Sequence, residues 1–188
     1  KGLNYSDYEI CDLALKLEKI FNPLVGRQDS YGCGIKGFKR TIFNSDKSLN
    51  IEPLSHDIFR KFKFYLISVG KSRNSTGILK SLNFEDRKLM CDDVNLGLEF
   101  IQSKNHTDLN NLILKSWGDK KRTSNLISND DVRLVENDLY ELKRYGVLSY
   151  KLCGAGAGGY FLTVTDKKYK MLLKTKDIEI NVDNRGLK

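Results

Sequence analysis

The chain has 188 residues, of which 40% are hydrophobic and 30% charged, a balance typical of a globular protein with a core of its own. Its 32 Lys and Arg residues outnumber its 24 Asp and Glu residues, which gives a net charge of +8. The basic residues lack the aromatic interleaving of a nucleic-acid interface, and no apolar run matches a membrane span, so neither partner is expected. The positive charge fits a solvated lysine-rich surface or a field that attracts phosphorylated ligands.

The cysteines and histidines argue against a disulfide framework and against a metal centre. The four cysteines include no C-x-x-C pair, which favours a reducing, cytoplasmic compartment. His56 and His106 are isolated from each other and from any cluster with metal-ligand spacing. No metal site built by the protein is therefore expected.

The first predicted element is a helix from Ser6 to Ile20. Ser6 is a good N-cap, and Glu9 three residues later completes a capping box. The chain starts at Lys1 instead of Met and enters this helix almost at once. We interpret this as a natural N-terminus that is missing, with a processed or tagged protein as the alternative.

The elements that follow predict an α+β fold. A glycine-interrupted turn region is expected over 26–37, and short strands over 38–43, 49–52 and 62–69. Apolar residues at helical spacing predict consecutive helices over 75–82, 86–102, 107–121 and 130–145. The last part of the chain predicts strands over 147–152, 160–164 and 178–182, with a helix over 166–173. The order indicates antiparallel strands that carry helices on one face.

A glycine-rich loop lies between two strand-forming runs. It reads Gly154-Ala-Gly-Ala-Gly-Gly159, with four glycines in six positions. Glycine loses the most backbone freedom on folding, so this density indicates positive φ angles or a close approach to a phosphate or another backbone. A tight hairpin is the alternative. The loop lacks the Gly-Lys-Ser/Thr ending of a P-loop and does not open a helix as a dinucleotide fingerprint does.

A second candidate region is Val25-Gly-Arg-Gln-Asp-Ser-Tyr-Gly-Cys-Gly34. It gathers an arginine, an amide, a carboxylate and a hydroxyl between glycines. Asp29 in such a segment is either a functional carboxylate or a structural cap, and the residues alone do not favour one of the two.

Four segments, taken in order, match one known pattern. They are Gly26-Arg-Gln-Asp-Ser-Tyr31, the run from Gly70 to Leu79, Trp117 to Lys121 with Ile127-Ser-Asn129 after it, and the run from Tyr145 to Phe161. Together they resemble the C-terminal two thirds of a GHMP-superfamily small-molecule kinase. Within that superfamily the chain is most similar to the sugar kinases of the D-glycero-D-manno-heptose 7-phosphate kinase type.

The resemblance implies a fold, an activity and a set of partners. Residues 1–60 would be a remnant of the N-terminal domain, and residues 61–188 the ferredoxin-like C-terminal domain. The implied activity is phosphorylation of a hydroxyl on a sugar or sugar phosphate, with ATP and Mg²⁺ as cofactors. The implied partners are that substrate and the missing N-terminal segment of the same protein, and a homodimer is compatible with the resemblance.

The resemblance also implies roles for particular residues. Asp29 would be the catalytic carboxylate that orients or deprotonates the accepting hydroxyl, since phosphoryl transfer depends on alignment and charge neutralisation. Gln28, Ser30 and Arg73 would contact the substrate, although Arg73 could equally be a surface arginine or helix cap. The loop residues at the phosphate site would be Gly154, Ala155, Gly156, Gly158 and Gly159. Lys120 and Lys121 could reach phosphate, but a solvated helix end is favoured, and Trp117 is expected in the core.

Several departures from the family pattern keep alternatives open. Ser30 stands where the family often has Gln, Cys33-Gly34-Ile35-Lys36 replaces a run of small residues, and Ala157 replaces a loop glycine. The Gly/Ser-rich nucleotide loop of the superfamily is not in these 188 residues. We therefore expect a partial kinase, inactive alone and active when the upstream part is restored. The rivals are a degenerate, non-catalytic sugar-phosphate-binding module and a mevalonate- or homoserine-type kinase.

Overall fold

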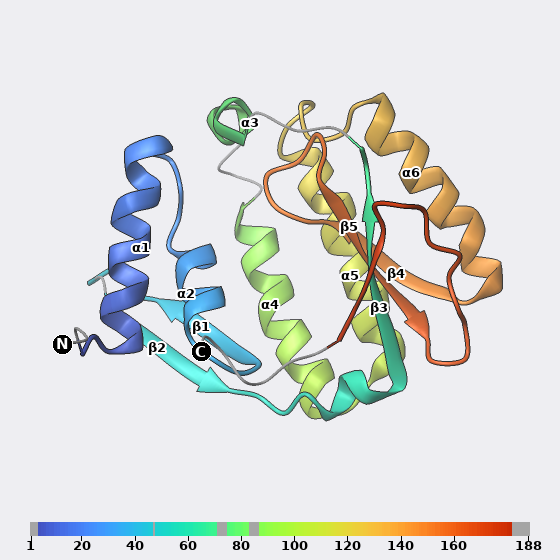
Figure 1. The fold of residues 1–188 in the computed structure, drawn as a ribbon. Coiled ribbons are helices and arrows are strands. Elements are labelled where there is room, and N and C mark those ends of the chain that lie inside the picture. Colours follow the sequence, from blue (N-terminus) through green and yellow to red (C-terminus); the bar gives the residue numbers. More distant parts are fainter. Residues whose placement is uncertain (1–3, 47, 71–74, 83–86, 182–188) are drawn as a thin grey trace. The chain divides into compact units, whose positions relative to one another are not determined.

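The structure of the protein is a computed structural model that describes residues 4–46, 48–70, 75–82 and 87–181, with only the backbone at 75–76 and 87–90. The chain divides into two compact units. One is built on the residues up to His56, here called the N-terminal unit, and the other spans Asp57–Asn181, here called the C-terminal unit. Figure 1 labels the helices and strands of both. None of the helices in the described ranges is long and apolar enough to cross a membrane.

The N-terminal unit begins with the predicted capped helix. Helix α1 covers Asp7–Phe21, and its capping box is confirmed. The Ser6 hydroxyl accepts from the Glu9 backbone N–H at 3.3 Å, and the Glu9 carboxylate accepts from the Ser6 backbone N–H at 2.8 Å. These bonds satisfy donors that a helix N-terminus leaves without partners.

A second helix replaces the turn that the sequence predicts over 26–37. Helix α2 covers Gln28–Gly34. Tyr31 is buried in it, and its hydroxyl donates to the Asp12 carboxylate of α1 at 2.5 Å. At the other end, Lys39 Nζ donates to the Gly32 carbonyl at 2.9 Å and to the Ile35 carbonyl. The prediction of a turn is wrong because these contacts outweigh the low helix propensity of the glycines.

The unit is completed by a hairpin. Strands β1 (Lys39–Phe43) and β2 (Leu49–Pro53) pair antiparallel, with Thr41 opposite Ile51. The two strands predicted from the sequence are confirmed, and each differs from its predicted bounds by one residue.

The C-terminal unit holds a sheet of four antiparallel strands in the order β4-β5-β3-β6. The strands are β3 (Phe62–Ser68), β4 (Val147–Leu152), β5 (Tyr160–Asp166) and β6 (Ile178–Ile180). The helices are α3 (Ser75–Ser81), α4 (Arg87–Gln102), α5 (His106–Arg122) and α6 (Asp130–Glu141), with one-turn 3₁₀ helices η1 (Asp57–Lys61) and η2 (Leu142–Tyr145). Helices α5 and α6 pack against β4, and α4 packs against α5 (Figure 1). The predicted α+β fold of antiparallel strands with helices is confirmed.

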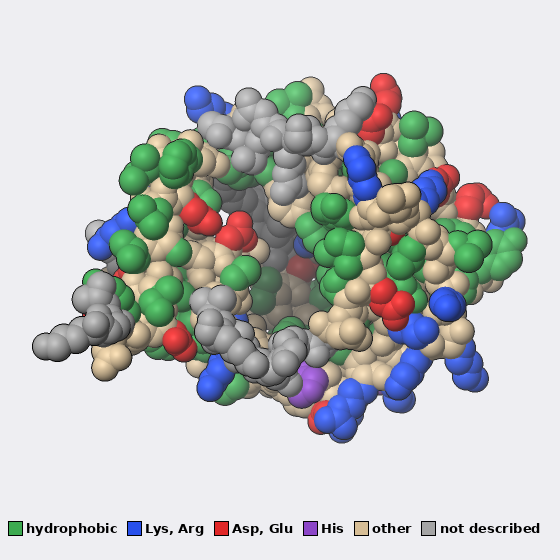
Figure 2. All heavy atoms as spheres, in the orientation of Figure 1, with side chains coloured by type: hydrophobic (Ala, Val, Ile, Leu, Met, Phe, Trp, Pro, Cys, Tyr) green, Lys and Arg blue, Asp and Glu red, His purple; other side chains and the backbone are tan. Residues whose placement is uncertain are grey.

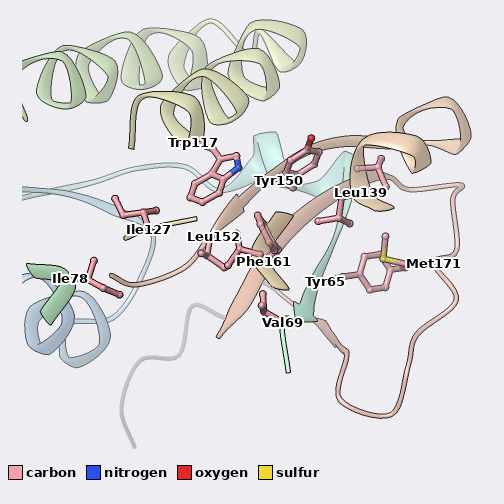
Figure 3. Packing of buried hydrophobic residues seen from close by; sticks show 12 residues of the cluster. Tyr65, Val69, Ile78, Trp117, Ile127, Leu139, Tyr150, Leu152, Phe161 and Met171 are labelled. Carbon is pink, nitrogen blue, oxygen red and sulfur yellow. The ribbon is translucent and has the colours of Figure 1, made fainter. Parts of the chain in front are cut away.

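One predicted helix of this unit is absent. Residues 167–177 contain turns and irregular chain where the sequence predicts a helix over 166–173. The Asp166 carboxylate accepts from the Lys168 backbone N–H at 2.8 Å, which turns the chain at once. Beyond the turn, Met171 is buried in the core beside Tyr65 (Figure 3). Burial of this side chain outweighs the helical spacing of the segment.

The core of the C-terminal unit is centred on aromatic side chains. Trp117 is 2% exposed and Phe161 is fully buried, and their rings meet edge to face with centroids 5.5 Å apart. Tyr150 packs on Phe161 in the same manner at 6.1 Å. Trp117 Nε1 also donates to the Glu136 carboxylate at 2.9 Å, so its polar atom is satisfied. Figure 3 shows these rings in the middle of the cluster, and the expectation that Trp117 is a core residue is confirmed.

The cysteines differ in exposure. Cys11 on α1 is buried, whereas Cys33, Cys91 and Cys153 are exposed. All four lie within the described residues, and none forms a disulfide.

Candidate functional site

The glycine-rich loop joins strands β4 and β5 in the C-terminal unit. Leu152 and Phe161 are the last paired residues before it, and the Cys153 backbone N–H donates to the Tyr160 carbonyl at 2.9 Å. The loop therefore connects the two strands of a hairpin, which was the alternative prediction for this segment. Gly154 and Gly159 have φ angles of +69° and +92°, which a side chain would disfavour.

Close approach to a neighbouring segment explains a third glycine. Gly156 has a φ of +136°, and a Cβ added there would lie 2.9 Å from the Ile127 Cα. Ile127 is fully buried and belongs to the connection between α5 and α6. The loop thus packs backbone to backbone on this connection, and only glycine fits at the contact.

Ala157 has a conformation that is unusual for a residue with a side chain. Its φ is +57°, in the left-handed region, which costs about 1–2 kcal/mol for an L-residue. Both of its backbone polar groups are bound by the α5–α6 connection. Its N–H donates to the Ile127 carbonyl at 2.7 Å, and its carbonyl accepts from Asn129 Nδ2 at 3.0 Å.

Lys120 at the end of α5 also binds this loop. Its Nζ donates to the Leu152 carbonyl at 3.2 Å and to the Gly154 carbonyl. The neighbouring Lys121 donates to the Glu136 carboxylate at 2.5 Å, and both ammonium groups lie over the Trp117 ring. A solvated helix end was the wrong expectation for this lysine pair, because each ammonium group has a partner within the fold.

A charged network supports the helices beside the loop. Lys115 Nζ donates to the Asp93 carboxylate at 2.5 Å and to the Asp119 carboxylate at 2.9 Å, and both acids are buried. Burial by itself would raise the pKa of Asp119, but the hydrogen bond from Lys115 and the charges of Lys115 and Arg122 outweigh it and hold that pKa below its usual range. The spacings of Lys115 and Arg122 from Asp119, four and three residues on one helix, are sequence signals of this network, whereas the contact with Asp93 has no such signal.

Lys151 on strand β4 has a different environment. Its Nζ donates to the Ser116 hydroxyl at 3.1 Å. Burial lowers the pKa of Lys151, although Asp93 and Asp119 act in the opposite direction. Lysine side chains therefore lie on the strand that enters the glycine-rich loop and on the helix end that binds it.

The other candidate region lies in the N-terminal unit. Asp29 is exposed in the first turn of α2, and its carboxylate makes no hydrogen bond or ion pair with any residue that the structure describes. The Arg27 guanidinium lies 5.2 Å and 5.1 Å from the ring centroids of Tyr31 and Phe43. This stacking fixes the start of α2 and presents Asp29 to the solvent.

The remaining predicted site residues are placed as follows. Gln28 is exposed beside Asp29 on α2. Ser30 is buried, and its hydroxyl donates to the Arg27 carbonyl at 3.3 Å. Arg73 lies outside the described residues. The substrate-binding roles of these residues stay predictions.

No group of three or more His, Cys, Asp or Glu side chains in the described ranges could hold a metal ion.

Two curated proteins are similar in sequence to this chain. The D-glycero-alpha-D-manno-heptose 7-phosphate kinase of Campylobacter jejuni is 26% identical over 187 residues, covering 91% of this chain and 54% of that kinase. The L-fucokinase/L-fucose-1-P guanylyltransferase of Bacteroides fragilis is 30% identical over 182 residues, covering 87% of this chain and 18% of that protein. No protein-family model matches the chain.

Solved structures show the same fold at low sequence identity. Lactococcus lactis galactokinase in complex with galactose has a TM-score of 0.64 at 14% identity, covering 87% of this chain and 53% of that one. Mevalonate-3-kinase of Thermoplasma acidophilum with mevalonate 3-phosphate and ADP bound has a TM-score of 0.55 at 15% identity, covering 89% and 58%. The chain thus spans about half the length of the heptose kinase and of these structures, and a smaller part of the bifunctional fucokinase.

Proposed function

Because the chain belongs to the GHMP kinase superfamily, we propose that it takes part in the ATP-dependent phosphorylation of a hydroxyl on a sugar or sugar phosphate. The observation that carries the proposal is the glycine-rich loop from Gly154 to Gly159, with its positive φ angles and its backbone contacts to the α5–α6 connection. Glycine lets a phosphate approach the main chain closely, and Lys120, which binds the loop, adds positive charge there.

Asp29 is the proposed catalytic residue. An exposed carboxylate without a partner among the residues that the structure describes is available to accept a hydrogen bond from a substrate hydroxyl, and so to orient it or take its proton. Phosphoryl transfer needs this alignment more than covalent participation. Bound ATP and Mg²⁺ would supply the phosphoryl group and neutralise its charge. The residues of this chain would bind, orient and exclude water.

The substrate class is proposed from the sequence relatives. The name of the C. jejuni relative gives a heptose 7-phosphate as its substrate, and the name of the B. fragilis relative gives L-fucose. We propose a heptose 7-phosphate or a related sugar as the acceptor, with Gln28 and Arg73 among its contacts. ATP-dependent chemistry and four cysteines without a disulfide fit the cytoplasm, where we place the protein.

A second candidate is a sugar-phosphate-binding module without turnover. Two observations favour it. Ala157 occupies a left-handed position that glycine would adopt without strain, and the Ser30 hydroxyl is bound inside its own helix instead of being exposed to a substrate. In this case the chain would bind a sugar phosphate but release no ADP.

Coupled ADP release distinguishes the two functions. The chain would be assayed with ATP, Mg²⁺ and a panel of heptose 7-phosphates, hexoses and fucose, alone and together with the half of the C. jejuni kinase that this chain does not match. We expect turnover only in the combined sample. Sugar-phosphate binding without ADP release in either sample would favour the binding module.

A matched pair of variants tests the role of Asp29. Asp29→Asn removes the base and should lower kcat by about 10²–10⁴-fold. Asp7→Asn is the control, because Asp7 is also an exposed aspartate in the first turn of a helix. Full turnover of Asp29→Asn would show that Asp29 has another role.

A further inference from the structure

We propose that Asn129 is a positioning residue that sets the shape of the glycine-rich loop and links it to the start of helix α6. The proposal rests on the proposed function for its ligand class, a phosphate group, but not for its geometry. One amide side chain makes both connections. Its Nδ2 donates to the Ala157 carbonyl at 3.0 Å, and its Oδ1 accepts from the Val132 backbone N–H at 3.0 Å as the N-cap of α6.

The bond to Ala157 completes a two-point clamp. Ile127 accepts from the Ala157 N–H at 2.7 Å, and Asn129, two residues later, donates to the carbonyl of the same residue. The peptide groups on both sides of the Ala157 Cα are therefore held. Fixing these two groups fixes φ and ψ, which accounts for an alanine that persists at a φ of +57°.

The clamp rests on a part of the fold that does not move easily. Ile127 is fully buried, and its own N–H donates to the Ser124 carbonyl at 3.3 Å. Gly156 packs directly on Ile127, with no room for a Cβ between them. Asn129 therefore connects the loop to a rigid base, whereas a flexible base could not define its shape.

The shape of the loop decides which way its backbone N–H groups point. Successive backbone N–H groups of a turn can converge on an anion, and the φ and ψ angles of the turn set where they point. Losing the bond to Ala157 would let this residue move toward the right-handed region that its side chain prefers, which would redirect the N–H groups of the residues beside it. Asn129 would thus act on phosphate binding without touching the ligand.

The same side chain couples the loop to α6. When a phosphate fixes the loop, the Ala157 carbonyl holds Asn129 more firmly, and Asn129 in turn holds the Val132 N–H. Phosphate binding at the loop should therefore protect the first turn of α6 from opening, and the effect must be reciprocal.

Asn129→Asp separates the two functions of the residue. Aspartate is as good an N-cap as asparagine, so the bond from Val132 is kept. It cannot donate to the Ala157 carbonyl, and its charge opposes that oxygen. The control is Asn105→Ala. Asn105 is the N-cap of α5, and its Oδ1 accepts from the Asp108 N–H at 3.2 Å. Its replacement removes a helix cap and leaves the loop untouched.

Hydrogen exchange at the Ala157 and Val132 amides reads out the proposal, with inorganic pyrophosphate as the probe. In the absence of pyrophosphate, Asn129→Asp should speed exchange at Ala157 by about tenfold, with little change at Val132 or in the melting temperature. Asn105→Ala should lower the melting temperature and leave exchange at Ala157 unchanged. Equal exchange at Ala157 in wild type and Asn129→Asp would overturn the proposal.

The pyrophosphate arm distinguishes this proposal from the proposed function. In the wild type, we expect pyrophosphate to protect the Ala157 and Val132 amides from exchange together. In Asn129→Asp, we expect pyrophosphate to bind at least tenfold more weakly and to give the Val132 amide no protection. Protection of Ala157 without Val132 in the wild type would refute the coupling. A third result is that pyrophosphate protects neither amide although Ala157 still exchanges faster in Asn129→Asp than in the wild type. Asn129 would then position the loop, and the proposal that the loop binds phosphate would be wrong.

Discussion

The two units of the chain differ in how far their apolar side chains are buried. In the C-terminal unit, twelve buried residues form one contiguous cluster around Trp117 and Phe161. In the N-terminal unit, the buried apolar side chains among the described residues are Cys11, Leu15 and Tyr31. This unit nevertheless carries nine of the eighteen large apolar side chains that are exposed in the described ranges, six of them on α1.

The difference shows that an element can follow its sequence signals closely without contributing to a core. Helix α1 has a complete capping box and an apolar stripe, yet Leu13, Leu17 and Ile20 on that stripe are exposed. Figure 2 shows apolar side chains gathered over α1. Two short helices and a two-stranded hairpin bury too little surface to be stable by themselves. The local signals decide that the helix forms, and the size of the core decides whether the unit can stand alone.

Separating the units gives the largest expected effect. Residues 57–181 expressed alone should unfold in one cooperative thermal transition, because their core is contiguous. Residues 4–56 alone should show no cooperative transition. Circular dichroism during heating measures both, and a cooperative melt of the 4–56 peptide would abolish the distinction between the units.

Removing one aromatic side chain from each unit sharpens the same comparison. Trp117→Ala should lower the free energy of unfolding by about 3–5 kcal/mol, because it opens a cavity beside Phe161. Phe21→Ala is the control, since Phe21 is 87% exposed, and it should change stability by less than about 0.5 kcal/mol. Urea unfolding followed by far-UV circular dichroism measures both. A cost for Phe21→Ala comparable with that of Trp117→Ala would mean that the α1 face is covered.

Glycines offer a smaller contrast. Gly156→Ala should cost about 1–3 kcal/mol, because its Cβ would meet Ile127 at 2.9 Å in a left-handed conformation. Gly32→Ala in helix α2 has no atom within 4 Å of the new Cβ and should gain about 0.5–1 kcal/mol. Differential scanning calorimetry of both variants tests the pair. The opposite signs are the essential result, and a neutral Gly156→Ala would show that the loop can shift away from Ile127.

The smallest effect concerns acid. The pKa of Asp119 is depressed in the folded state, so its ionised form stabilises the protein above the unfolded pKa of about 3.9. That stability is lost as the pH falls through the folded value. Asp119→Asn should cost about 1 kcal/mol at pH 7 and flatten the loss of stability below pH about 4. Asp130→Asn, at a side chain that is 90% exposed, should leave the pH profile unchanged, and an identical acid limb in wild type and Asp119→Asn would refute the assignment.

Much of the fold was predictable because its signals are local. The capping residues Ser6 and Gly146 mark the ends of helical segments, and the apolar patterns gave every strand within about two residues at either end. Helix α2 was missed because its glycines have a low helix propensity and because the contacts that stabilise it come from Asp12 and Lys39. The helix predicted over 166–173 was wrong because burial of Met171 depends on the whole sheet.

The sequence predicted which residue types make up the candidate loop, but not which residues hold that loop in place. The glycine-rich loop could be identified from the residue types alone, whereas Asp29 was singled out by the family resemblance, and its role stays a prediction. The residues that hold the loop could not, because Asn129 and Lys120 bind it from 28 and 34 positions away in sequence. An asparagine before a helix is recognised as a cap, and nothing in the sequence shows that its other amide atom reaches a distant carbonyl.

The uneven exposure of the cysteines gives the protein built-in positions for chemical labels. Cys33 lies one helical turn after Asp29 on α2, and Cys153 directly precedes Gly154. With Cys91 replaced by serine and Cys11 buried, a maleimide fluorophore would reach only these two thiols. On the proposed function, a dye at Cys33 would report a sugar that binds near Asp29, and a dye at Cys153 a phosphate that binds at the loop. The order in which two ligands bind could then be followed in real time, without a reporter reaction.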